Sequence, residues 1–194
     1  MLSQIRPAIV STVLFTLLLG VAYPLVVTGI AKVAFPAQAE GSLIRNASGQ
    51  VVGSALIGQG FAKPEYLHPR PSAAGMGYDA SNSSGSNYGP LNPDLIKRVK
   101  GDADALRASG IATVPADAVT TSASGLDPDI SPAYALLQVD RVAKARGVAA
   151  AAVSRVIGVH TQGPWLGFIG QPRVNVLQVN LALDASLPKD KPAA

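Results

Sequence analysis

The residues best suited to chemistry form a polar segment, Val119–Pro128, which is rich in hydroxyl side chains and contains Ser124 and Gly125. It runs into a helix signal, and the expected helix carries Gln138 and Arg141. Hydroxyl groups, a glycine and the amino terminus of a helix together can bind an anion such as a phosphate. The same groups can instead bond to one another in a rigid turn. The segment therefore leaves two interpretations open, an anion site and a structural turn.

The same region suggests a calcium site, because Asp127, Asp129 and Ser131 have the opening spacing of a calcium-binding loop. Such a loop needs glycine at its sixth position and a bidentate glutamate at its twelfth. The sequence has Pro132 and Gln138 at these positions, which excludes this kind of site. Acidic residues before a helix are better explained by the positive end of the helix dipole.

Other catalytic and cofactor motifs are missing from the sequence. It has no cysteine and only two histidines, His68 and His160, so we expect no metal site and no covalently bound cofactor. Phosphate-binding, dinucleotide-binding, zinc-protease and serine-hydrolase motifs are also missing. A membrane-anchored hydrolase that uses His160 as its base is the one enzymatic alternative, and no local motif marks the serine that it would need.

The distribution of charge argues against a nucleic-acid partner. Of the 16 lysines and arginines, two (Arg6 and Lys32) precede residue 40, and the remaining 14 are nearly balanced by 12 acidic residues. A domain with so little excess charge lacks the basic surface that nucleic-acid binding requires. We expect no nucleic acid among its partners.

These candidate residues follow an apolar stretch, Pro7–Ala31, that contains no charged residue. A bilayer core needs about 20 residues in a helix, and helix is the only structure available to a single span. We therefore predict a short tail at 1–6, a transmembrane helix at 7–31 and a linker at 32–40. Pro24 removes one hydrogen bond and should kink the second half of the helix.

A cleaved signal peptide is the alternative, because Ala37-Gln38-Ala39 resembles a processing site. The apolar stretch exceeds the roughly 7–15 residues of a signal sequence, which favours a retained anchor in contact with membrane lipid. Arg6 and the terminal amine before the span, against Lys32 and Arg45 after it, favour a cytoplasmic N-terminus and a periplasmic soluble domain.

The rest of the chain predicts an α+β fold: a single N-terminal transmembrane helix followed by one small mixed α/β soluble domain at 41–185, with a flexible C-terminal tail at 186–194. Period, caps and terminators indicate a hairpin at 43–52, helices at 92–110, 131–147 and 149–158, and a strand at 173–183. The irregular stretch 63–93 is either a linker or a binding loop.

The sequence also resembles the KdpC family, the C subunits of bacterial potassium-transporting P-type ATPases. The likeness covers nearly the whole chain in one order. It is carried by Arg6-Pro7-Ala8, Gly41–Ile44, Gly53–Gln59, Arg70-Pro71-Ser72, Gly85–Asn87, Asn92-Pro93, Val119–Pro128, Gln138, Arg141–Arg146, Gly170–Pro172, Val174-Asn175 and Asn180–Leu183.

The chain departs from the family pattern at three positions. Pro69 and Ser84 stand where the family usually has glycine, and Asp129 stands where histidine or asparagine is common. Pro69 and Ser84 remove backbone freedom, so the departures concern the shape of the loop around them and leave the resemblance intact.

The resemblance implies an accessory, non-catalytic subunit of a high-affinity, ATP-driven potassium uptake system in the bacterial inner membrane. Its partners would be a channel-like potassium-translocating subunit, an ATP-hydrolysing P-type subunit and a small membrane subunit. The sequence has no D-K-T-G-T phosphorylation motif, which agrees with a catalytic aspartate on another chain.

For the mechanism, the resemblance implies a catalytic chaperone that assembles the complex and raises the affinity of the ATP-hydrolysing subunit for ATP. Gln138 would contact the nucleotide, with Arg141 nearby and Ser124-Gly125 close to phosphate, so that ATP is reached through the catalytic subunit. An external domain would not meet cytosolic ATP. The competing interpretation is an external clamp that covers the potassium entrance through the loop near Gly85–Tyr88 without touching nucleotide.

Overall fold

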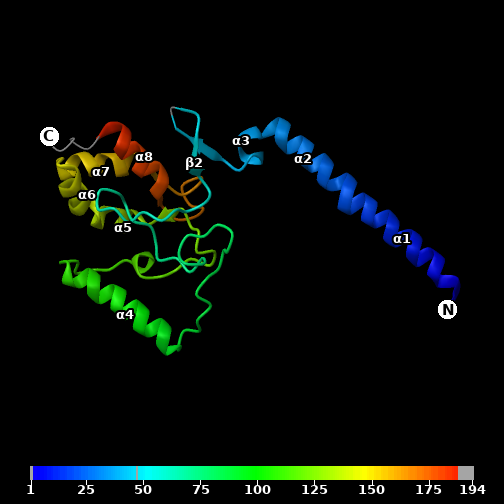
Figure 1. Cartoon of the computed structure of the whole chain (residues 1–194), viewed down its shortest axis with the longest axis horizontal. Helices are drawn as coiled ribbons and strands as arrows, with labels where there is room; N and C mark the ends of the chain where they lie inside the picture. The colour runs from blue at the N-terminus through cyan, green and yellow to red at the C-terminus, as the bar shows by residue number, and fades with distance from the viewer. Residues whose placement is uncertain (1, 47, 188–194) are drawn as a thin grey trace. The chain divides into compact units, whose positions relative to one another are not determined.

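The computed structural model describes residues 2–46 and 48–187. The chain divides after Ser54 into two compact units. The first contains a long apolar helix and a hairpin, and the second contains the helices and short strands of the soluble domain (Figure 1). The predicted α+β class with an N-terminal apolar helix is confirmed.

The apolar helix of the first unit is assembled from continuous helical segments. It comprises η1 (Leu2–Gln4), α1 (Ile5–Leu17), a π-helical segment η2 (Leu18–Ala22) and α2 (Tyr23–Ala34), and the short α3 (Pro36–Ala39) follows. Within the described residues, one helix, Ile5–Ala34, is long and apolar enough to cross a membrane. No residue of α1, η2 or α2 is buried. Its length and composition fit the predicted membrane span.

The π-helical segment ends two residues before Pro24. Proline has no N–H to donate, so the carbonyl four residues earlier, that of Gly20, loses its usual partner. A switch to wider hydrogen bonding over Leu18–Ala22 is a common way for a helix to absorb such a defect. The predicted disturbance by Pro24 therefore lies on its N-terminal side.

The predicted hairpin is present as β1 (Leu43–Arg45) paired antiparallel with β2 (Val51–Ser54). The side chain of Asn46 shapes its turn, because Oδ1 accepts hydrogen bonds from the backbone N–H groups of Ser48 and Gln50. Asparagine makes such turns readily, since its short amide reaches its own backbone two residues on.

The second unit packs helices against a small antiparallel sheet in the order β3-β5-β4. The most deeply buried side chains of its core include those of Val142, Val153, Val174, Val179 and Leu183. The elements are α4 (Pro93–Ala108), η3 (Ala116–Ala118), β3 (Asp129–Ile130), α5 (Pro132–Leu137), α6 (Val139–Arg146), α7 (Ala150–Val159), β4 (Thr161–Gln162), β5 (Arg173–Asn175) and α8 (Val176–Ser186).

The predicted helix 131–147 is interrupted, and this is a correction. Ser131 caps α5 by accepting from Tyr134 N–H, and Gly147 ends α6 at φ +67° as expected. Between them, the N–H of Gln138 bonds to the carbonyl of Ala135, one residue short of the α-helical partner. The resulting tight turn separates α5 from α6 at Gln138.

The predicted strand at 173–183 is wrong beyond its first three residues. Only Arg173–Asn175 is a strand, and Val176–Ser186 form α8. Asn175 starts the helix, because its side-chain oxygen accepts from the N–H of Gln178. Apolar residues are so dense here that they fit a period of two and a helical period equally well. Of the predicted flexible tail, residues 188–194 lie outside the described residues, and Ser186 is the last residue of α8.

Candidate functional site

Two buried amide side chains hold the backbone of an extended loop segment, residues 64–68, against α6 and α8. The Oε1 atom of Gln138 accepts from His68 N–H at 2.7 Å, and its Nε2 donates to the His68 carbonyl at 3.0 Å. Asn180 does the same for Leu67, at 2.7 and 3.0 Å. Each amide therefore replaces the neighbouring strand that this segment lacks. These side chains, together with Arg141 and Arg146, are called the polar clamp below.

Arg141 strengthens the Gln138 contact and reaches further along the segment. Its Nη1 donates to the carbonyls of Pro64 and Tyr66 at 2.7 and 3.1 Å, and its Nη2 donates to Gln138 Oε1 at 2.6 Å. The Nε2 atom of His68 lies 3.2 Å from Nη1. Burial, and then the positive charge of Arg141, lower the pKa of His68 below its usual value. These two effects favour the neutral form of the His68 ring.

Arg146 completes the polar clamp with a fully buried side chain. Its guanidinium donates to the carbonyls of Glu65 and Leu187 at 2.8 and 3.0 Å and pairs with Asp184 at 2.8 Å. Its Cζ atom also lies 5.2 Å from the ring centroid of Tyr66. Burial, followed by the hydrogen bond to Asp184, raises the pKa of Tyr66. Three directions of the planar guanidinium are thus satisfied internally.

The polar segment Val119–Pro128 is held by a second arginine. Arg70 forms an ion pair with Asp127 at 2.7 Å and donates to the carbonyls of Thr120 and Thr121 at 3.3 and 3.4 Å. The Arg70 guanidinium therefore binds the segment near both of its ends. Such hydrogen bonds stabilise a rigid turn.

Ser124 and Gly125 lie inside this turn and contact the loop 72–85. The Ser124 hydroxyl accepts from Leu126 N–H at 3.1 Å, and its carbonyl accepts from Ser84 N–H at 3.0 Å. The Gly125 carbonyl accepts from the Ser72 hydroxyl at 2.6 Å. Gly125 has φ +66°, and a Cβ there would lie 2.6 Å from backbone atoms of the neighbouring loop. Only glycine fits this position without displacement.

The four residues singled out from the sequence thus form two pairs. Gln138 and Arg141 meet around residues 64–68, whereas Ser124 and Gly125 meet around residues 72–85. Sequence reasoning missed Asn180 and Arg146 as partners of the first pair. For Asn180 the available signal was a polar residue among apolar ones. It became informative only once residues 176–186 were known to form a helix.

A groove of about 640 Å³ opens beside the first pair. It is lined by His68, Gln138 and Arg141 on one side and by residues 109–112, after α4, on another. To contact a ligand in this groove, Gln138 would have to exchange hydrogen bonds that it already makes to His68 and Arg141. Within the described residues, no group of three or more His, Cys, Asp or Glu side chains is placed to hold a metal ion.

His160, the base of the hydrolase alternative, lies at the end of α7. Its Nδ1 atom is 2.8 Å from the carbonyl of Val156, one helical turn earlier. This contact orients the ring along its own helix. It is the arrangement expected of a histidine that caps a helix C-terminus.

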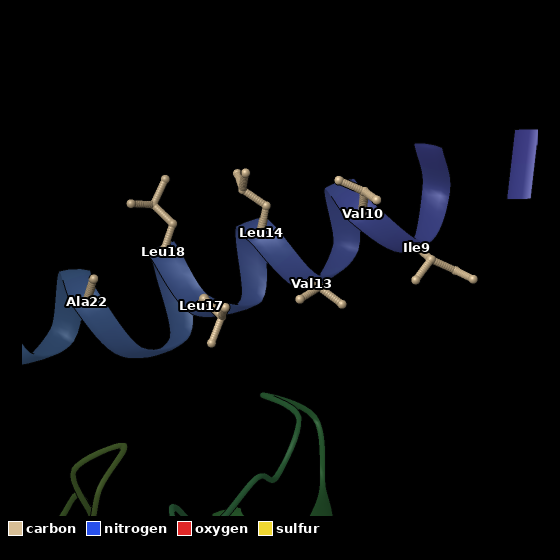
Figure 2. Close-up of a pocket in the computed structure, with 7 residues that line it drawn as sticks. All are labelled: Ile9, Val10, Val13, Leu14, Leu17, Leu18 and Ala22. Carbon is tan, nitrogen blue, oxygen red and sulfur yellow. The ribbon is translucent and has the colours of Figure 1, made fainter. Parts of the chain in front are cut away.

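The first half of the apolar helix carries a shallow groove of its own. Figure 2 shows two rows of side chains along α1 and η2, spaced four residues apart and pointing to different sides of the helix. The groove between them is about 600 Å³ and is lined by Ile9, Val10, Val13, Leu14, Leu17, Leu18 and Ala22. Rows at this spacing form the ridges that pack into the grooves of a neighbouring helix.

Comparison with known proteins gives one consistent result. Residues 5–185 match the family model KdpC, described as the c chain of a K⁺-transporting ATPase. The potassium-transporting ATPase KdpC subunit of Caulobacter sp. (strain K31) is 71% identical over 97% of this chain and 96% of its own length. The subunits of the same name from Beijerinckia indica and Geobacter sulfurreducens are 63% and 53% identical, over 99% and 96% of this chain and 98% and 100% of their own lengths.

Proposed function

Because the chain belongs to the KdpC family, the c chains of K⁺-transporting ATPases, we propose that it is a membrane-anchored, non-catalytic subunit that braces a potassium-uptake pump. Its partners are a channel-like potassium-translocating subunit, a P-type ATP-hydrolysing subunit that carries the catalytic aspartate, and a small membrane subunit. The apolar helix binds among the membrane helices of these partners, and the soluble domain covers the potassium entrance.

The polar clamp is the observation that carries the bracing role. Its amide and guanidinium groups are engaged with the backbone of residues 64–68 and 187. Side chains used in this way fix the shape of a long loop, which would otherwise fluctuate at a cost in conformational entropy on binding. The domain thus offers its partners a preformed surface.

The loop that follows supplies this surface. Gly85, Ser86 and Tyr88 line a pocket of about 530 Å³ together with Arg98 and Asp102 of α4. The Ala123 carbonyl lies 3.0 Å from where a Cβ on Gly85 would be, so the loop packs closely on the rigid turn. We infer that this loop contacts the potassium-translocating subunit.

The bracing role requires the soluble domain to be periplasmic and the N-terminus to be cytoplasmic, in the inner membrane. Arg6 before the span supports this orientation. Because the sequence has no cysteine, single cysteines can test it. Ser124→Cys and Lys97→Cys place thiols at exposed positions of the domain, and Ser3→Cys places one before the span.

A membrane-impermeant maleimide should label the two domain cysteines in intact spheroplasts and Ser3→Cys only after lysis. The two domain positions control for local shielding, and the N-terminal position controls for leakage. The reverse pattern would place the domain beside cytosolic ATP and would overturn the covering role.

Direct contact with nucleotide is the second candidate function, and the groove beside Gln138 and Arg141 favours it. Leu136 lines this groove and is 52% exposed, so Leu136→Trp fills the groove without touching the polar clamp. Ala133→Trp, on an exposed residue of the same helix outside the groove, is the matched control. If nucleotide binds in the groove, only Leu136→Trp raises the KM for ATP of the purified complex.

Bracing predicts instead that both tryptophan variants leave the KM for ATP unchanged. It also predicts that the chain leaves the membrane in mild detergent together with two larger membrane proteins. A chain that purified alone and hydrolysed a substrate would support the hydrolase alternative and overturn the bracing role.

A further inference from the structure

A short apolar hairpin projects from the soluble domain between β4 and β5. Trp165, Leu166 and Phe168 are 67%, 66% and 76% exposed, and Ile169 is 46% exposed. No charged residue occurs from Gly163 to Pro172. Single exposed apolar side chains are ordinary, but a contiguous run of this kind marks a surface that contacts another apolar phase.

The fold itself maintains this exposure. Trp165 and Ile169 form an antiparallel bridge, with their backbone N–H and carbonyl groups 2.8 and 2.9 Å apart. Leu166 and Gly167 form the tip with φ of +52° and +81°. A positive φ is unfavourable for leucine, so the bridge and the tip together define a specific tight turn. In this turn the apolar side chains are exposed.

We propose that this hairpin inserts into the interfacial layer of the bilayer to which the chain is anchored, and so holds the soluble domain at the membrane surface. Tryptophan favours this layer because its ring is amphipathic. Phenylalanine and leucine beside it supply apolar area, as in other segments that bind in the plane of a membrane. The absence of charge removes the main cost of insertion.

This inference rests on the proposed membrane anchoring, which supplies the membrane at high local concentration. Twenty residues, 35–54, connect the end of α2 to the second unit, and they span at most about 70 Å when extended. A tether of this length keeps the hairpin within reach of the bilayer. Even a weak interfacial contact is then populated, because binding is intramolecular.

Lipid fits the hairpin better than a protein groove does. A stable protein interface buries about 800 Å² on each partner and has a polar rim that forms hydrogen bonds. The hairpin is five residues long, and the ten-residue stretch Gly163–Pro172 that contains it has no charged side chain. A bilayer interface requires neither a large area nor a matching rim.

Trp165 is the chain's only tryptophan, so its fluorescence reports on this hairpin alone. We would reconstitute the full chain in phosphatidylcholine vesicles with ordinary or brominated acyl chains. Insertion should shift the emission to shorter wavelength and lower its intensity at least twofold in brominated vesicles. Emission that brominated lipid leaves unchanged, and that aqueous iodide quenches, would overturn the proposal.

Two variants make the result specific. Phe168→Ser should weaken quenching by brominated lipid, and it should fold normally because Phe168 is largely exposed. Trp165→Phe combined with Lys97→Trp moves the reporter to an exposed face of α4 and should remain water-exposed.

Extraction with alkaline carbonate tests the anchor separately. A chain that resists extraction but shows a water-exposed Trp165 refutes the hairpin proposal alone, whereas a chain that is extracted refutes the anchoring. In the complete pump, an environment-sensitive dye on Phe168→Cys should report lipid. Shielding that requires the other subunits would assign the hairpin to a protein contact and overturn insertion into lipid.

Discussion

In the polar clamp, Gln138, Arg146 and Asn180 are only 6%, 2% and 1% exposed, whereas in the apolar hairpin Trp165 and Phe168 are 67% and 76% exposed. Polar side chains usually prefer water and apolar ones the core, so both regions place side chains unfavourably. In the clamp, hydrogen bonds to backbone groups of the domain offset the cost of burying polar side chains. In the hairpin, no contact among the described residues offsets the cost of exposing apolar side chains.

This difference lies in where the side chains find their partners. A buried polar side chain is tolerated when its hydrogen bonds are made. In the clamp, Gln138 makes them to the backbone of His68, and Asn180 makes them to the backbone of Leu67. Gln138, which the sequence singled out, therefore makes hydrogen bonds that stabilise the fold. The exposed apolar residues of the hairpin, which the sequence did not single out, are those for which we propose a contact outside the domain.

The largest effect should come from removing the most deeply buried amide. Asn180→Ala leaves both the N–H and the carbonyl of Leu67 without a partner in a site that water does not reach. Each unpaired buried group costs about 1–3 kcal/mol, so the free energy of unfolding should fall by about 3 kcal/mol. Urea unfolding of the full chain in detergent, followed by circular dichroism, measures it.

Gln178→Ala is the matched control, because this amide lies on the same helix, is half-buried and takes no part in the clamp. Its effect should stay within about 0.5 kcal/mol. Equal effects of the two substitutions would mean that the buried amide does no more than a surface one, and the comparison between clamp and hairpin would fail.

A smaller effect should follow when the charge of the clamp is kept and its geometry is lost. Arg146→Lys retains a cation beside Asp184 but cannot also donate to the carbonyls of Glu65 and Leu187 in fixed directions. We expect a loss of about 2 kcal/mol in the free energy of unfolding. Arg155→Lys, on the exposed face of α7, should change little. A stable Arg146→Lys variant would show that charge alone holds the segment.

Much of the fold could be predicted because local signals agreed with tertiary context. The apolar stretch predicted the long helix, Asn46 and Gly49 predicted the hairpin, and Asn92 and Gly147 predicted helix ends. In each case a cap, a turn residue or a long apolar run acts over a few residues. Such signals survive without knowledge of what packs against them.

The failure at 173–183 shows where local signals end. Read as a strand, Asn180 falls on the face opposite Leu177, Val179, Leu181 and Leu183 and points to solvent. Read as α8, it lies one turn after Val176 and one turn before Leu183, facing the core. Period alone could not decide, and the partner that justifies a buried asparagine, the backbone of Leu67, lies 113 residues away in sequence. The clamp was therefore beyond sequence reasoning.

Removing the largest side chain of the hairpin should hardly affect stability. Trp165→Ala in a packed core would cost about 3–5 kcal/mol, but Trp165 is 67% exposed. We expect a change within about 0.5 kcal/mol in the absence of vesicles. The same urea titration checks it. A loss above about 1.5 kcal/mol would mean that the ring packs on the domain, and the distinction between the two regions would disappear.

The smallest effect concerns pH and the histidine at the edge of the clamp. Burial and the neighbouring Arg141 lower the pKa of His68 in the folded chain, while the unfolded chain keeps a value of about 6.5. Between the two values the unfolded chain binds more protons, so stability falls as the pH drops through this window and is constant above it.

Asp129 contributes to the pH dependence of stability with the opposite sign. Burial raises the pKa of its carboxyl above 3.8 in the folded chain. In the pH range just above 3.8 the folded chain therefore binds more protons at this group, and its contribution to stability increases as the pH falls. Urea midpoints measured between pH 5 and 8 should therefore decline below about pH 6.5 in the natural chain, and His68→Gln should remove that decline. If the urea midpoint of His68→Gln declined with pH as in the natural chain, His68 would bind protons equally in the folded and unfolded states. The contacts of His68 with Gln138 and Arg141 would then not shield its ring from water.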